Sequence, residues 1–114
     1  MALRSRILVV ADDAQTRRYL EVRLHGRGYR TIFANGGESA VAAIRREHPR
    51  LALVDMSMPQ HKGVDVLERL VEGSLASIPV IALVGAAASG IGETEAELAE
   101  AIESALAAGA RAAA

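Results

Sequence analysis

Carboxylates stand at the ends of two strongly apolar runs in this 114-residue chain. The run 7–10 leads through one alanine into Asp12 and Asp13, and the run 51–54 leads directly into Asp55. Apolar runs of this kind are typical of buried strands, and in an open α/β sheet binding sites form at the edge where parallel strands end. The residue types and their spacing therefore predict an acidic site at one edge of a sheet.

Carboxylates gathered at such an edge repel one another, and a hard divalent cation that prefers oxygen ligands relieves the repulsion. Mg2+ is the obvious candidate, and we expect Mg2+ or Mn2+ to bind weakly at Asp13 and Asp55. A carboxylate beside the cation can attack a phosphoryl group, because the metal neutralises charge on the transferred oxygens. The structural alternatives are that Asp13 caps the helix that follows it and that Asp55 is a polar residue facing a loop.

The elements that position these acids are predicted to alternate between strand and helix, which gives a parallel sheet with crossover helices. The expected strands are 6–11, 29–34, 51–55 and 80–84, and their continuous apolar character implies burial on both faces. Helices are expected at 14–25, around Ala40 to Ile44 with an end at Pro49, at 64–72 and at 93–108. An apolar stripe on the last helix consists of Leu98, Ala101, Ile102, Ala105 and Leu106.

Three segments carry a resemblance to a known family: VVADDAQTRRYL, LALVDMSMPQHKGVDVLERL and IPVIALVG. In this order and spacing, they make residues 5–85 resemble the receiver domain of two-component response regulators. The resemblance implies a flavodoxin-like α/β fold, a doubly wound parallel sheet with strand order 2-1-3-4. We expect one domain over residues 1–114, regular to about residue 85 and followed by an atypical helix at 93–108.

The resemblance also implies roles for the residues of the acidic edge. Asp55 would accept the phosphoryl group, and Asp13 would ligate Mg2+ directly. Asp12 would ligate the metal largely through water, and Ser57 would contribute its backbone carbonyl. The implied partner is a sensor histidine kinase or a phosphotransfer protein. The implied protein is not an enzyme, apart from catalysing its own phosphorylation and dephosphorylation.

Two positions depart from the receiver pattern. The family usually ends strand four with Ser or Thr, whose hydroxyl binds the phosphoryl oxygen, but here the position is Val84. The family also has a lysine at the end of strand five, whereas Lys62 is the single lysine of this chain and no fifth strand is recognised after residue 84. We therefore expect no catalytic lysine and a missing or truncated strand five, so that phosphorylation of Asp55 propagates poorly.

The loop after Asp55 holds two weaker candidates. His61 and Lys62 stand where the family more often has a small acidic pair with glycine. They are candidates for contact with a bound phosphoryl group, and the alternative is that both are exposed loop residues. His25 and His48 lie at predicted helix ends and need no function.

Two classes of function remain open. The first is a receiver phosphorylated on Asp55 with Mg2+, which the intact acidic residues favour. The second is a degenerate receiver that acts as a phosphorylation-independent docking or dimerisation module, which Val84 and the absent strand-five lysine favour. A flavodoxin-like enzyme or cofactor carrier is disfavoured, because no loop offers an aromatic platform or an anion-binding nest. Gly85 and Gly90 have the spacing of a phosphate loop, but the lysine that should follow is absent.

Self-association is predicted from the edge of the expected sheet. Without a fifth strand, the run 80–84 is an apolar edge that lacks the charges that usually protect such edges. We expect a symmetric homodimer that buries this strand and the side chains of Leu98, Ile102 and Leu106. The alternative is that the last helix folds back onto its own sheet.

Composition excludes several other classes. The chain has no cysteine, so it has no disulfide and no thiolate metal site. Residues 1–50 contain ten arginines and five acidic residues, whereas residues 51–114 contain three cations and nine acidic residues. The simpler interpretation of this split is solvated helix faces, and the alternatives are head-to-tail association or contact with an acidic partner surface. The scattered basic residues and scarce aromatics argue against nucleic-acid binding.

No apolar run reaches the about 20 residues of a membrane span, and no signal peptide is seen, so we expect a cytoplasmic protein.

Overall fold

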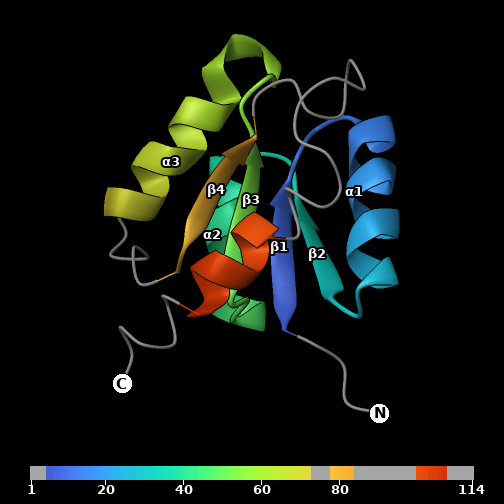
Figure 1. The fold of residues 1–114 in the computed structure, drawn as a ribbon. Coiled ribbons are helices and arrows are strands. Elements are labelled where there is room, and N and C mark those ends of the chain that lie inside the picture. Colours follow the sequence, from blue (N-terminus) through green and yellow to red (C-terminus); the bar gives the residue numbers. More distant parts are fainter. Residues whose placement is uncertain (1–4, 73–77, 84–99, 108–114) are drawn as a thin grey trace.

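Strands and helices alternate along the chain in the computed structural model, which describes residues 5–72, 78–83 and 100–107 (Figure 1). The elements in chain order are β1 (Arg6–Val10), α1 (Ala14–Gly26), β2 (Arg30–Ala34), α2 (Gly37–Glu47), β3 (Leu51–Asp55), the 3-10 turn η1 (Pro59–His61), α3 (Lys62–Glu72) and β4 (Val80–Leu83). Residues 100–107 are also helical. The expected alternation of strand and helix is confirmed.

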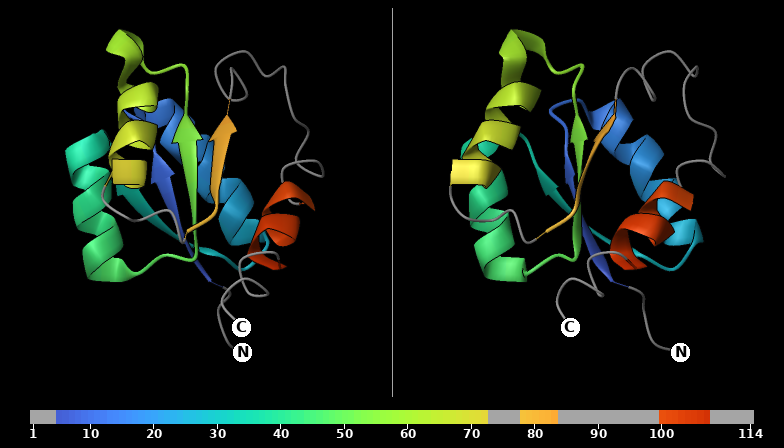
Figure 2. Two further views of the ribbon diagram at one scale, coloured as in Figure 1. Left: turned by 90° about the vertical axis from the view of Figure 1, so that its left-hand side faces the viewer. Right: turned by 60° about the vertical axis from the view of Figure 1, so that its left-hand side comes forward.

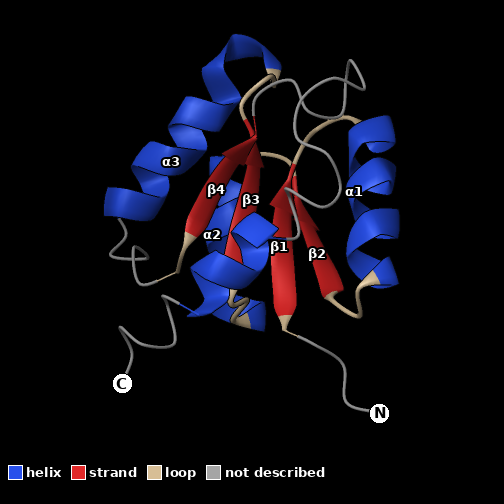
Figure 3. Ribbon diagram, in the orientation of Figure 1, coloured by secondary structure: helices blue, strands red, loops and turns tan. Residues whose placement is uncertain are grey.

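The described strands form one parallel sheet in the order β2-β1-β3-β4 (Figure 3). This is the flavodoxin-like order predicted from the sequence. The register pairs Val10 of β1 with Val54 of β3 and with Ala34 of β2, so these strands end at the same level. All the residues of β3 are buried, as the continuous apolar run of this strand predicted.

Helices cover both faces of the sheet, as Figure 2 shows. Alternate residues of β1 point to opposite faces, because successive side chains of a strand alternate. Ile7 and Val9 pack with Leu20 of α1, whereas Leu8 and Val10 pack against α2 and α3. The core is therefore two aliphatic layers, one on each side of the sheet.

The helix at residues 100–107 lies on the α1 side of its own sheet. Ile102 is 1% exposed and belongs to the same buried cluster as Ile7 and Val9, and Ala105 and Leu106 pack against that cluster. Of the two arrangements expected for this helix, the single chain has the one in which the helix folds back. A homodimer stays a prediction, and in the single chain Ile102 is already buried against its own sheet.

Helix ends follow from local sequence. Asp13 caps α1, and α2 ends at His48, which adopts the left-handed conformation (φ 51°) immediately before Pro49. Helix α3 begins at Lys62, two residues earlier than expected, because η1 continues directly into it. Strand β1 ends at Val10 rather than at Ala11, although the Ala11 amide still donates to the Ala34 carbonyl at 3.0 Å.

Several expectations fall outside the described residues. They concern Val84, Leu98, the glycines at 85 and 90, the start of the last helix, and a fifth strand. Among the described residues, no helix is long and apolar enough to cross a membrane.

Candidate functional site

The two acidic strand ends lie side by side at one edge of the sheet. β1 and β3 are adjacent and parallel, and Val10 is level with Val54, so Asp55 follows one strand where Ala11 and Asp12 follow the other. The sequence prediction that β1 and β3 bring their acids to a common edge is confirmed. The site therefore rests on the two central strands of the described sheet.

Asp55 is the more buried acid, with 7% of its surface exposed. Its Oδ1 accepts a hydrogen bond from the Ser57 amide at 2.9 Å and another from the Ser57 hydroxyl at 2.6 Å. Within the described part of the chain, Oδ2 makes no hydrogen bond. The Met56 amide donates to the Leu83 carbonyl at 2.8 Å, which fixes the backbone just after Asp55. The carboxylate is thus held through one of its two oxygens.

Asp13 is oriented by the helix that it caps. Its Oδ2 accepts hydrogen bonds from the amide and the hydroxyl of Thr16, both at 2.8 Å. These bonds favour the ionised carboxylate, so the pKa of Asp13 lies below its ordinary value. The Thr16 hydroxyl is the largest cause, and the Thr16 amide is the second. Asp13 does cap α1, which is the structural alternative to a metal-binding role. Capping by Asp13 gives no reason for the presence of Asp55 at the end of the neighbouring strand.

Asp12 faces across the edge toward the loop that follows β3. Its Oδ2 lies 3.2 Å from Nζ of Lys62, and the two residues are 50 positions apart in the sequence. The side chain of Asp12 is 22% exposed and that of Lys62 is 40% exposed. Lys62 therefore has a specific partner, and the sequence did not predict this contact with Asp12.

The loop between β3 and α3 folds closely over the strand end. Gln60 and His61 adopt left-handed φ angles of 61° and 56°, which L-residues with side chains rarely adopt. A Cβ atom on Gly63 would come 3.0 Å from the Asp55 carbonyl oxygen and 3.0 Å from the Met56 Cα. Glycine at this position lets the first turn of α3 lie directly against the strand that carries Asp55.

The aspartates at this edge are residues of the type that binds Mg2+, but in the structure each of them already has a protein partner. Carboxylate oxygens are ligands that this ion prefers, and three aspartates stand at the ends of the two neighbouring strands β1 and β3. Each of Asp12, Asp13 and Asp55 is engaged by a protein donor, and within the described ranges no group of three acidic, histidine or cysteine residues is arranged to hold a metal ion. Oδ2 of Asp12, Oδ2 of Asp13 and Oδ1 of Asp55 would have to exchange their present partners before these same oxygens could hold a metal. The role of the Ser57 carbonyl stays a prediction.

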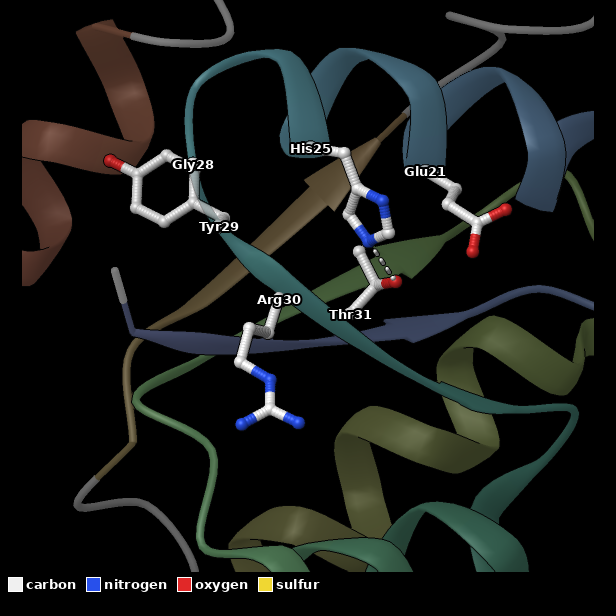
Figure 4. A pocket seen from close by; sticks show the side chains of 6 residues that line it. All are labelled: Glu21, His25, Gly28, Tyr29, Arg30 and Thr31. Carbon is white, nitrogen blue, oxygen red and sulfur yellow. Dashed lines mark hydrogen bonds between the residues drawn. The ribbon is translucent and has the colours of Figure 1, made fainter. Parts of the chain in front are cut away.

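His25 and His48 lie away from this edge, whereas His61 lies in η1, within the loop that folds over the end of β3. His48, just after α2, and His61 are both exposed. His25 lines a shallow pocket of about 440 Å3 between the end of α1 and the start of β2, at the opposite end of the strands from Asp55 (Figure 4). Its Nε2 lies 3.2 Å from Oγ1 of Thr31. A contact with a threonine is enough to explain this side chain.

Comparison with known proteins identifies the class. The model of the response regulator receiver domain family matches residues 7–110. The chain therefore belongs to the response regulator receiver domains, the signalling modules of two-component systems. The match extends well beyond residue 85, where the recognisable sequence pattern ended.

Individual relatives agree with this assignment. The chain is 41% identical over 80 residues to a probable transcriptional regulator, ycf27, of Porphyridium aerugineum, covering 70% of this chain and 32% of that protein. It is 37% identical over 81 residues to the DNA-binding response regulator MtrA of Mycobacterium leprae, covering 71% of this chain and 35% of that protein. The chain thus spans about a third of the length of these curated relatives. A CheY-like receiver domain from Methanospirillum hungatei has the same fold, with a TM-score of 0.78 and 23% identity over 96% of this chain and 98% of that one.

Proposed function

We propose that this chain is a phosphoacceptor receiver domain and that Asp55 accepts the phosphoryl group in the presence of Mg2+. The observation that supports this most is the setting of Asp55. It ends a fully buried central strand, Ser57 orients one of its carboxylate oxygens, and two further acids follow the neighbouring strand. A polar loop residue with no function would need neither the burial nor the neighbours.

The proposed reaction is transfer of a phosphoryl group to the Asp55 carboxylate. An Asp55 oxygen attacks phosphorus, the bond from phosphorus to the donor breaks, and an acyl phosphate forms. Bound Mg2+ would neutralise charge on the transferred oxygens. Ser57 holds Oδ1 through its amide and hydroxyl and so leaves Oδ2 as the nucleophile. Asp12 and Asp13 would hold the metal after exchanging their present partners, Lys62 and Thr16.

The proposed phosphodonor in the cell is a sensor histidine kinase or a phosphotransfer protein, as membership of this family supports. The proposed recipient of the signal is a partner protein or an output domain. No nucleic-acid contact through this domain is proposed, because its aromatic residues make up only 3% of the chain.

The test is incubation with acetyl phosphate and Mg2+ followed by measurement of the intact mass. The wild type is expected to gain one phosphoryl group, with acetate as the leaving group, and Asp55→Asn is expected to gain none. Asp65→Asn is the matched control, since Asp65 is an exposed acid on α3 that pairs with Arg69. Absence of an adduct on the wild type, or an adduct that persists in Asp55→Asn, would contradict the proposal.

A second candidate is a phosphorylation-independent docking or dimerisation module. The observation that favours it is that all three acids are already bound to protein donors. Light scattering coupled to gel filtration at several loading concentrations tests the expected homodimer. A mass of 12.0 kDa at every concentration would mean that the helix at 100–107 provides sufficient cover for the sheet. A stable dimer without any phosphoryl adduct would favour this candidate over the first.

A further inference from the structure

The ion pair between Lys62 and Asp12 differs from two other ion pairs in the described part of the chain. Arg46 with Glu47 and Arg69 with Asp65 are near neighbours in sequence on exposed helix surfaces, and pairs of this kind contribute little to stability. Lys62 and Asp12 instead join the start of α3 to the segment that follows β1, with Asp12 only 22% exposed. This pair therefore connects the two strand ends that carry the acidic site.

The position of Lys62 is unfavourable apart from this contact. Lys62 is the first residue of α3, and a positive charge near a helix N-terminus is opposed by the helix dipole. The two residues before it adopt left-handed conformations that side chains disfavour. In the structure the ammonium group of Lys62 meets an opposite charge, the carboxylate of Asp12, at 3.2 Å.

The backbone beside Lys62 fixes where its side chain starts. Gly63 lies so close to the Asp55 carbonyl that even a methyl group would crowd it, and the Lys62 amide donates to the Pro59 carbonyl. The backbone of Lys62 is thus fixed beside the strand end, and from there its ammonium group reaches Asp12 at 3.2 Å.

We propose that Lys62 is the built-in cation of the acidic site and competes with the divalent metal for Asp12. The proposal rests on the proposed function, because it concerns the metal that phosphorylation of Asp55 would need. While Lys62 neutralises Asp12, part of the repulsion that would draw in a metal is already relieved. Lys62 would have to give up this contact before Asp12 could hold the metal, directly or through water, so Lys62 weakens metal affinity.

The test is a Mg2+ titration of the whole chain, followed by the amide shifts of residues 11–13 and 55–57. Lys62→Gln keeps a long polar side chain and removes the charge, and we expect it to bind Mg2+ about three- to tenfold more tightly than the wild type. Arg46→Gln is the matched control, because it removes one positive charge from the C-terminal end of α2, at the opposite edge of the sheet. At moderate ionic strength this variant should change the Mg2+ affinity less than about twofold. Lys62→Arg keeps the positive charge that Lys62→Gln removes, so its Mg2+ affinity should be as weak as that of the wild type. A purely structural role of Lys62 would not predict this difference between the two variants.

Equal affinity in the wild type and Lys62→Gln would overturn the proposal, and so would weaker binding in Lys62→Gln. No shift in either protein at high Mg2+ would overturn it as well. The phosphorylation assay separates this failure from that of the proposed function. If acetyl phosphate with Mg2+ still modifies Asp55 while Lys62→Gln leaves metal affinity unchanged, the receiver function stands and the role of Lys62 does not.

Discussion

The ends of β1 and β3 carry the same chemical group in different surroundings. Asp55 at the end of β3 is 7% exposed, and its partner, Ser57, is two residues away in its own loop. Asp12 and Asp13 after β1 are more exposed, and they are held by Lys62 from a distant loop and by Thr16 of α1. One strand end is organised locally, and the other depends on elements that fold around it.

This difference suggests a division of roles between the two ends. A nucleophile must be held in one orientation with little freedom, which the buried Asp55 and its short Ser57 contact provide. Metal ligands must exchange partners as the ion enters, which side chains with solvent access do at lower cost. The four predictions below test this division, beginning with the largest expected effect.

The division predicts unequal effects on phosphorylation. Asp55→Asn should abolish the adduct completely, whereas Asp13→Asn should slow its formation on the order of tenfold or more and still reach one phosphoryl group per chain. The reason is that Asp13 would support the metal and would not form the covalent bond. Time courses of intact mass with acetyl phosphate measure both. Equal abolition by the two substitutions would show that the strand ends do not differ in this way.

The β3 end should also be the more sensitive to packing. Gly63→Ala places a methyl group 3.0 Å from the backbone at Asp55 and Met56, so we expect a loss of about 1–3 kcal/mol in the free energy of unfolding. Gly26→Ala at the end of α1 is the control, because its Cβ would meet nothing within 4 Å, and it should be neutral or stabilising by up to about 1 kcal/mol. Urea unfolding measures the two. Similar values for both variants would contradict the tight approach of α3 to β3.

Substitution of Asp13 separates capping from metal binding. Asn is as good a cap as Asp, so Asp13→Asn should keep the urea midpoint close to that of the wild type, whereas Asp13→Ala should lower it through loss of the cap on α1. Both variants should bind Mg2+ more weakly than the wild type, because both remove the anionic ligand. If Asp13→Asn matched the wild type in metal affinity, Asp13 would be a cap alone.

The smallest expected effect is on the pKa of Asp13. In the metal-free protein this pKa lies below the 3.8 of an unperturbed aspartate, mainly because of the Thr16 hydroxyl. Since the folded value is the lower one, the stabilising effect is complete above about pH 3.8 and is lost as the pH falls through the folded pKa. Thr16→Val should raise the pKa of Asp13 toward 3.8 without reaching it, because the Thr16 amide still donates. Carboxyl shifts recorded by NMR against pH would show this, and an unchanged midpoint would exclude the hydroxyl as the main cause.

Most of the fold could be predicted from the sequence for a clear physical reason. Continuous apolar runs such as 51–54 must be buried on both faces, which requires helices on each side of a parallel sheet. Strand ends then follow from where the apolar residues stop, and this places Asp55 and Asp12 at one edge. Element ends that depend on backbone geometry were less predictable, as the early start of α3 at Lys62 shows.

The sequence by itself determined that the acids after β1 and at the end of β3 lie at one sheet edge, because the ends of parallel strands share an edge and the family resemblance implied the strand order. Only the tertiary structure decided what each acid contacts. That Lys62 reaches Asp12 depends on two left-handed residues in η1 and on the close approach of Gly63, and neither leaves a periodic signal in the sequence. It also decided where the last helix packs, since an apolar stripe fixes which side is buried but not which surface buries it.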